Sequence, residues 1–362
     1  MALLIVKIRF PIMGFAGCLV WAIGREISVE YDLLKVVHAK LLGVPVGLRV
    51  GVLFFSLNLD DTMWFRNLRA YRLPERLGLD AEAMAQRLES RPFTPCRPAQ
   101  PLSAGWVAAL DDSVDSLVHA AGPYWLLRLK REEKLLPSSV IRDEVGSRVL
   151  QIQTAEARKV HRKERLQLTD EVTQDLMPRA FTRARSIEAM VFEKDGWLWV
   201  NNASAPRAED FLSALREALG SLPAVLPVTR KNPAAVMSEW LLHDQLPEGF
   251  ELGTEADLVE PGEEGGVVRA RSMLLDCDEI RAHIESGKQV QRLALAWQGR
   301  LEFVLGADLV IRRLKFAEAL TTAHDDINED PLARRDADFL LMSETLAELW
   351  PALLQAFGGL EA

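Results

Sequence analysis

From Met63 onward, short segments with apolar residues at every second position alternate with segments whose apolar residues recur every three or four positions. The first spacing is typical of strands and the second of amphipathic helices. The strands are expected at 64–73, 124–129, 187–192, 197–200 and 267–273, with three more within 289–314. The helices are expected at 80–89, 140–168, from Thr169 to about Met177, and at 206–219, 233–243, 278–286 and 344–357, the last after an apolar segment at 339–342.

Turn and cap residues support several of these assignments. Asp195-Gly196 between two apolar runs favours the positive φ of a tight hairpin turn. Asn232-Pro233 supplies a helix cap with proline at the first helical position. Hairpin-joined strands with helices between groups of strands indicate an α+β fold with antiparallel sheets and packed helices. The polar helical stretch at 138–183 is expected to project from the body as a basic subregion.

Residues 1–62 differ in character from the remainder of the chain, which we treat as one region, 63–362. The run 10–23 is apolar behind two positive charges, as in a secretory signal or membrane anchor, but it contains Pro11, Gly14 and Gly17. It is also shorter than the roughly 20 residues that span a bilayer. The favoured interpretation is a start codon assigned too early, with translation beginning at Met63.

Composition describes an ordered protein, with 49% hydrophobic and 26% charged residues in 362. The three cysteines, Cys18, Cys96 and Cys277, are far apart and form no CxxC pair, which favours a reducing cytoplasm. The formal net charge of -9 argues against nucleic acid as a partner, because duplex affinity rests largely on lysine and arginine neutralising phosphates.

Sequence motifs for catalysis are absent. The sequence contains no P-loop, GxGxxG, HExxH or GxSxG motif, and its six histidines are scattered without metal-ligand spacing. The acidic clusters Asp325-Asp326 with Glu329-Asp330, and Glu263-Glu264, could gather magnesium for phosphodiester cleavage, but their spacing favours solvated charge. We therefore expect no enzymatic activity, no cofactor and no metal site.

Charge is unevenly distributed, and the stretch 128–185 holds fourteen basic residues against nine acidic ones. Spacings of three and four place several of the cations between Arg158 and Arg165 on one side of the expected helix. Such a row suits contact with phosphates, although ordinary solvated helix charge is an alternative. The candidate DNA-binding residues in this stretch are Lys130, Arg131, Lys134, Arg158, Lys159, Arg162, Lys163, Arg179, Phe181 and Arg183.

Phe181, flanked by two arginines, could wedge at a base step, stack on DNA, pack against another subunit or lie in the core. A second basic set lies on or beside expected strands, where alternation would put Arg313 and Lys315 on one face. Its candidate DNA-binding residues are Arg269, Arg271, Lys288, Arg313 and Lys315, with Arg292 and Arg312 nearby.

Short motifs spread over 63–362 carry a family resemblance in their order and spacing. They are WFRNL (64–68), FTPC (93–96), GWV (105–107), REEKLLP (131–137), LMPRAF (176–181), ASA (203–205) with AED (208–210), LGSLP (219–223), GG (265–266), RLKF (313–316) and DADF (336–339). In these the chain resembles the RdgC family of bacterial, recombination-associated DNA-binding proteins. Ser272 stands where that pattern suggests another basic residue.

The resemblance implies a homodimer that closes as a ring around duplex DNA without reading its sequence, and that restrains RecA-dependent recombination. Single-stranded DNA is a further candidate ligand, and no small-molecule substrate is implied. A cytoplasmic, nucleoid-associated location follows from it. Cations confined to the inner wall of a ring would reconcile DNA binding with a negative total charge. The alternatives are a metal-dependent nuclease and a recombination factor acting mainly through protein contacts.

Overall fold

The computed structural model describes residues 63–262, 265–323 and 330–361. The chain divides into two units, 1–60 and 61–362, and the described residues all belong to the second. The extension 1–62, the pair Glu263-Glu264 and most of the acidic cluster at 325–330 therefore lie outside the described residues. No helix in the described part is long and apolar enough to span a membrane.

The first sheet is antiparallel and has six strands. Its order is β1-β6-β5-β4-β2, and β3 also pairs with β4. These strands are β1 (Arg69–Arg72), β2 (Leu102–Val107), β3 (Val118–Ala121), β4 (Tyr124–Leu135), β5 (Phe181–Phe192) and β6 (Trp197–Val200). The β5–β6 turn passes through the short 3-10 helix η2 (Glu193–Asp195) to Gly196, whose φ of 71° is the left-handed conformation expected of Asp-Gly.

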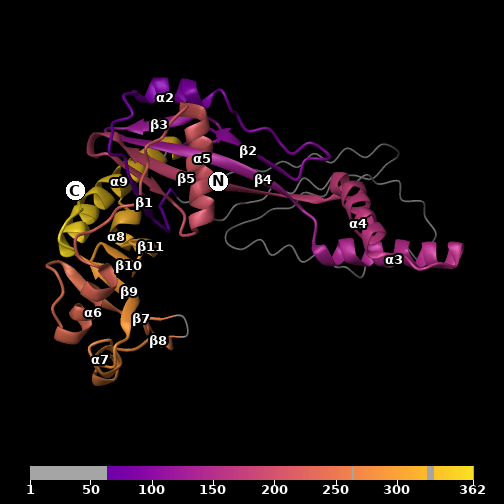
Figure 1. Ribbon diagram of the computed structural model, residues 1–362. Coiled ribbons are helices and arrows are strands. Elements are labelled where there is room, and N and C mark those ends of the chain that lie inside the picture. Colours follow the sequence, from indigo (N-terminus) through magenta and orange to yellow (C-terminus); the bar gives the residue numbers. More distant parts are fainter. Residues whose placement is uncertain (1–62, 263–264, 324–329, 362) are drawn as a thin grey trace, which may run out of the picture. The chain divides into compact units, whose positions relative to one another are not determined.

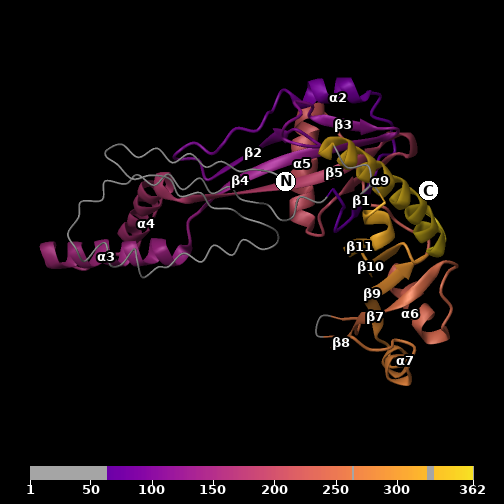
Figure 2. The same ribbon diagram turned by 180° about the vertical axis from the view of Figure 1, so that it is seen from behind.

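Two hydrophobic clusters cover the two faces of this sheet. On one face, helices α2 (Ala81–Leu88) and α5 (Ala205–Leu219) pack against alternate residues of the strands, including Leu127 and Val191. On the other face, Leu126 and Trp199 join a larger cluster that includes helix α9 (Pro331–Ala356). The sheet therefore has helices on both faces, as Figures 1 and 2 show, and its inner residues are buried between them.

The second sheet has five antiparallel strands in the order β11-β10-β9-β7-β8. These strands are β7 (Phe250–Val259), β8 (Val267–Arg271), β9 (Gln289–Trp297), β10 (Leu301–Gly306) and β11 (Ile311–Phe316). One face packs with helix α6 (Pro233–His243) and helix α7 (Asp278–Glu285) in the larger cluster. The short helix α8 (Glu318–Thr321) follows β11. Alternation places polar side chains on the opposite face of the sheet, among them the partly exposed Glu255 and the exposed Arg292.

The strands β4 and β5 form one uninterrupted ladder, from the pair Tyr124 and Phe192 to the pair Leu135 and Phe181. Burial falls along this ladder, because β5 is buried from Ile187 onward and exposed before it. Its far end leads into helix α3 (Ser138–Glu156), helix α4 (Arg162–Leu176) and the 3-10 helix η1 (Met177–Arg179), visible in Figure 1. The two helices share a small hydrophobic cluster of their own.

The expected α+β class with antiparallel sheets is confirmed, and so is the tight turn between β5 and β6. The bounds of α2, α5, α6 and α7 agree with the expected ones to within a residue or two. The strands expected at 124–129 and 187–192 are each six residues longer, as β4 and β5. Three further expectations about elements are wrong. The strand expected at 64–73 shrinks to β1, because the amide groups of Arg66 and Asn67 donate to the Asn201 side chain instead of a ladder. The helix expected at 140–168 is two helices, and Thr169 lies inside the second.

The third wrong expectation concerns the C-terminal helix, which is continuous from Pro331. Its Asp330 side chain accepts from the Leu332 amide at 2.9 Å and so caps the helix. Three expected strand runs within 289–314 are confirmed as β9 to β11. The strands β2, β3 and β7 were not expected from the sequence.

Candidate nucleic-acid interface

The expected basic residues, together with Arg185, lie in three groups. We call the first group the hairpin cations; it lies between α3 and α4, in the first turn of α4 and in η1, and consists of Arg158, Lys159, Arg162, Lys163, Arg165 and Arg179. The ladder cations lie on the outer part of β4 and β5 and consist of Lys130, Arg131, Lys134, Arg183 and Arg185. The third group belongs to the second sheet and is described separately below.

The sequence spacing predicts that the cations from Arg158 to Arg165 form a row on one helix face. The structure does not confirm this row. The helix ends at Glu156, and Ala157 adopts a left-handed conformation with φ of 47°. Four residues, Arg158 to His161, then connect the two helices before α4 begins at Arg162. Nothing in the sequence marks this break, because alanine is a strong helix former. Five of the six cations nevertheless lie at the junction of the two helices, and Arg179 lies beyond the other end of α4.

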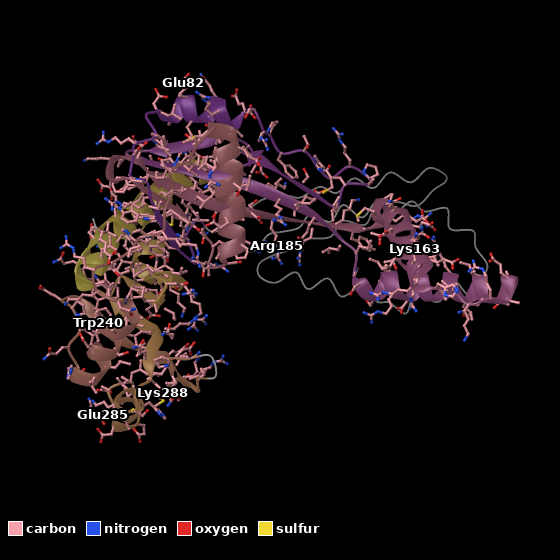
Figure 3. The ribbon with its side chains drawn as sticks, in the orientation of Figure 1. Glu82, Lys163, Arg185, Trp240, Glu285 and Lys288 are labelled. Atoms are coloured by element: carbon pink, nitrogen blue, oxygen red, sulfur yellow. The ribbon has the colours of Figure 1, made fainter. Side chains whose placement is uncertain are left out.

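Three cations stand in the first turn of α4, where the helix macrodipole favours acids. Arg162, Lys163 and Arg165 are exposed, and none has a carboxylate partner among the described residues. Lys163 is labelled in Figure 3. Their placement therefore opposes helix stability while it concentrates positive charge at a helix N-terminus, an arrangement that suits anions.

Arg158 is the exception in this group. Its guanidinium donates to both carboxylate oxygens of Glu164 at 2.6 and 2.7 Å and also to Glu156. The hydrogen bond from Arg158 lowers the pKa of Glu164 below its ordinary value. Arg158 is therefore already engaged, whereas Lys159 beside it is exposed without such a partner in the described part of the chain.

The ladder cations point to both faces of the β4–β5 pair. Lys130 lies over the ring of Phe93, with its Nζ 5.0 Å from the ring centroid, whereas Arg131 points to the α5 side and pairs with Asp210. Lys134 is half-buried, with no ion pair among the described residues. Arg183 pairs with Glu133 across the two strands, and its hydrogen bond lowers the pKa of that carboxyl group.

One pair on this ladder brings like charges together. Arg131 stands directly opposite Arg185, which is exposed and labelled in Figure 3. Like charges directly opposite in an antiparallel pair are destabilising. Arg185, which the sequence reasoning did not single out, has no carboxylate partner among the described residues. The outer ladder therefore carries positive charge that folding does not require.

Phe181 begins β5 with 83% of its surface exposed, so the core-packing alternative for this residue is wrong. Other apolar side chains of the same region are also exposed, with values of 39% for Leu135 and 64% for Leu150. Folding of the described residues therefore gives Phe181 little burial, and its exposed ring suits contact with another molecule.

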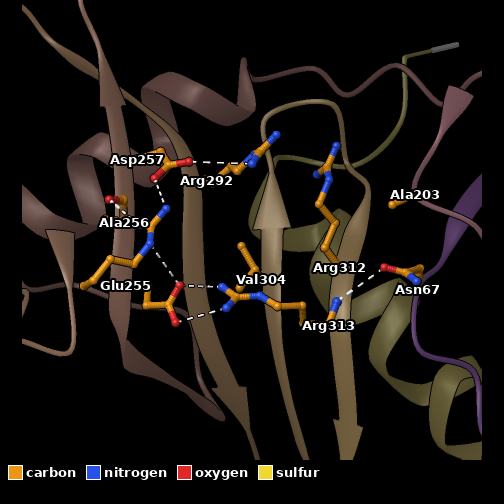
Figure 4. A pocket seen from close by; sticks show the side chains of 10 residues that line it. Asn67, Ala203, Glu255, Ala256, Asp257, Arg292, Val304, Arg312 and Arg313 are labelled. Atoms are coloured by element: carbon orange, nitrogen blue, oxygen red, sulfur yellow. Dashed lines mark hydrogen bonds and ion pairs between the residues drawn. The ribbon is translucent and has the colours of Figure 1, made fainter. Parts of the chain in front are cut away.

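The exposed face of the second sheet carries the third group, which we call the sheet arginines: Arg271, Arg292 and Arg313. They come from β8, β9 and β11 and interact with two carboxylates of β7, Glu255 and Asp257. Together with Arg312, Asn67 and Ala203, these five residues line a hollow of about 330 Å³, drawn in Figure 4. Hydrogen bonding from Arg313 lowers the pKa of Glu255, although burial opposes the shift.

The other expected residues of this sheet are more dispersed. Arg269 is exposed on β8, and Lys288 lies 3.8 Å from Glu260. Lys315 lies 3.8 Å from Glu302, and a bulge between Arg312 and Lys315 interrupts the simple alternation expected from the sequence. Arg313 takes a φ of 51° at this bulge. Ser272, also with a positive φ, lies just beyond β8.

Sequence reasoning missed both carboxylates that hold the sheet arginines, because it did not recognise β7. The signal was present, since Glu255 and Asp257 alternate with the buried residues Ala256 and Leu258. The contact of Glu255 with Arg313, more than fifty positions away, depends on sheet order and not on local pattern.

A candidate metal centre is not found in the described residues, which contain no group of three histidine, cysteine or acidic side chains placed to hold an ion. One acidic residue of the clusters considered for nuclease chemistry, Asp330, caps α9. His119 pairs with Asp336 at 2.8 Å beside the ring of Phe339. This arrangement holds α9 against β3 and resembles a structural contact more than a reaction centre.

Comparison with known proteins gives a consistent result. A family model described as "Putative exonuclease, RdgC" matches residues 63–360. A recombination-associated protein RdgC of Pseudomonas entomophila is 44% identical over 302 residues, which cover 83% of this chain and 98% of that protein. The protein of the same name from Yersinia enterocolitica is 40% identical over 299 residues, 82% of this chain and 98% of the relative.

Proposed function

Because the chain belongs to the RdgC family of recombination-associated proteins, we propose that it is a non-enzymatic protein that binds duplex DNA without reading its sequence. The observation that carries the proposal is the set of exposed cations without carboxylate partners in the described residues at the start of α4, where they oppose helix stability. Lys159 and Arg179 extend this charge on either side of α4.

The side chains concerned suit phosphate contact more than base recognition. They are lysine and arginine side chains on a short connection, a helix end and exposed strands. Base reading usually needs a helix or ribbon that presents bidentate donors and acceptors to a groove. Phosphate contacts by contrast fix position without sequence information. Sequence-independent binding that weakens with salt is the behaviour that this set supports.

The proposal includes a homodimer that encloses the duplex and restrains RecA-dependent strand exchange. Family membership is its support, together with the uneven charge of a chain whose net charge is -9. Enclosure by two subunits would let cations face the DNA while acids face solvent. Exposed Phe181 and Leu150 are candidates for contacts with DNA or with the second subunit.

Mobility-shift titration with three unrelated duplexes of equal length, at several salt concentrations, tests the DNA-binding proposal. We expect similar affinities for the three duplexes. The logarithm of the affinity should fall linearly with the logarithm of the salt concentration. Strict preference for one duplex, or indifference to salt, would contradict it. Sedimentation with and without DNA tests the dimer, and a RecA strand-exchange assay tests the restraint of recombination.

A nuclease is the second candidate, and the wording of the matching family model is the observation that favours it. Incubation of the purified protein with supercoiled and linear plasmid in the presence of magnesium or manganese tests this activity. We expect intact DNA. Progressive shortening of linear DNA that EDTA abolishes and that persists through repurification would establish the nuclease and refute the non-enzymatic proposal.

A further inference from the structure

The ion pairs on the exposed face of the second sheet form one alternating series. Glu255 accepts from both terminal nitrogens of Arg313, one at 3.1 Å, and lies 3.4 Å from Nε of Arg271. Asp257 accepts from Nη2 of Arg271 at 2.6 Å and lies 3.7 Å from Nη1 of Arg292. Three guanidinium groups thus share two carboxylates, as the dashed lines of Figure 4 trace in part.

The acids lie beneath the arginines in this series. The side chain of Asp257 is 11% exposed and that of Glu255 is 25% exposed, against 45% to 58% for Arg271, Arg292 and Arg313. An approaching anion therefore meets guanidinium groups first. Each of those groups already donates to a carboxylate or lies within ion-pair distance of one.

We infer, on the basis of the proposed function, that Glu255 and Asp257 compete with DNA phosphate for the sheet arginines. A carboxylate and a phosphate take the same bidentate contact from arginine. A phosphate that enters the hollow must displace Glu255 from Arg313 or share the guanidinium with it. The carboxylates thus keep the DNA affinity of this face below the value that its arginines alone would give.

The arrangement differs from that of the hairpin cations, which have no such competitor in the described part of the chain except at Arg158. The chain therefore combines hairpin cations that mostly have no carboxylate partner in the described residues with sheet arginines that are held by carboxylates. Restraint at the second site would limit how tightly DNA is held after capture at the first.

Glu255→Gln tests the inference, with Glu251→Gln as the matched control. Glu251 lies four residues earlier on β7, is exposed, and has no ion pair within the described residues, so both changes remove one negative charge from the same strand. Fluorescence anisotropy with a labelled duplex should show that Glu255→Gln binds roughly three- to tenfold more tightly at low salt than Glu251→Gln. Its plot of log affinity against log salt should steepen by up to about 0.9, the equivalent of one further phosphate contact.

A double-mutant cycle assigns the gain to the freed arginine. Adding Arg313→Gln should remove most of the increase that Glu255→Gln produces. Asp257→Asn is an independent second variant and should also tighten binding. Equal affinity of Glu255→Gln and Glu251→Gln, or weaker binding by Glu255→Gln, would overturn the inference while DNA binding by the unchanged protein stands. Absence of binding by the unchanged protein would instead refute the proposed function.

Discussion

Neutralising the first turn of α4 separates a role in DNA binding from a role in folding. The triple change Arg162→Gln, Lys163→Gln and Arg165→Gln removes three cations from a helix end whose dipole disfavours them, each by about 0.3–1 kcal/mol. The variant helix should therefore be as stable as the original or more so. If each cation contacts one phosphate, the salt slope should fall by about 2.7 per subunit. When the salt concentration falls from 1 M to 0.1 M, the affinity of the original protein should therefore rise roughly 500-fold more than the affinity of the variant.

Fluorescence anisotropy over a potassium chloride series measures both the affinity and the slope, and far-UV circular dichroism reports helix content. A control variant, Arg76→Gln, Arg87→Gln and Lys194→Gln, removes the same charge from exposed sites around α2 and the β5–β6 turn. We expect the control to lose little affinity. Wild-type affinity and slope in the α4 variant would refute the assignment of this turn to DNA. Loss of helix content would refute the argument that its cations oppose folding.

Three further predictions concern single residues. Phe181→Ser should change the free energy of unfolding by less than about 0.5 kcal/mol in urea denaturation, because the ring is 83% exposed, yet weaken duplex binding in a mobility shift; a large loss of stability would contradict this. Gly105→Ala should lower the free energy of unfolding by about 1–3 kcal/mol, because a Cβ there would lie 2.5 Å from the Phe93 backbone. In the same urea assay Gly146→Ala, in open space on α3, should stabilise the protein slightly. Burial, assisted by Glu209, raises the pKa of Tyr71 to about 12. The stability that its bound proton contributes is therefore complete below pH 10 and is lost as the pH rises toward 12. Tyr71→Phe should reduce the loss of stability between these pH values, and an unchanged profile would contradict the assignment.

Local chemistry determined which elements could be predicted. Asp195-Gly196 and the Asn232 cap act within a few residues, and both features are present as expected. By contrast, β4 continues six residues past the expected end at Leu129, into a charged run beginning at Lys130. Pairing with β2 on one side and β5 on the other maintains that part of the strand, and neither partner is visible in the local pattern.

The same limit applies to the candidate interface. The sequence identified the region of excess positive charge, but spacing alone assigned Arg158 and Arg162 to one helix that the backbone interrupts at Ala157. It could not show that Arg158 is engaged by Glu164, whereas Lys163 has no ion pair in the described part. Availability for a ligand depends on which partners the folded backbone brings to each side chain. Asp330, an apparent member of an acidic cluster, likewise serves as a helix cap.

The helical pair α3 and α4 has its own hydrophobic cluster, in which Val145, Leu168 and Val172 are the buried members. This cluster is separate from the two that hold the sheets, and the exposed outer part of β4 and β5 links it to them through main-chain hydrogen bonds. Few buried contacts and an exposed link are the properties of a unit that opens at low free energy. We therefore expect the α3–α4 pair, which among the described residues is rich in cations without ion pairs, to open at a lower free energy than the two sheets, which would stay intact.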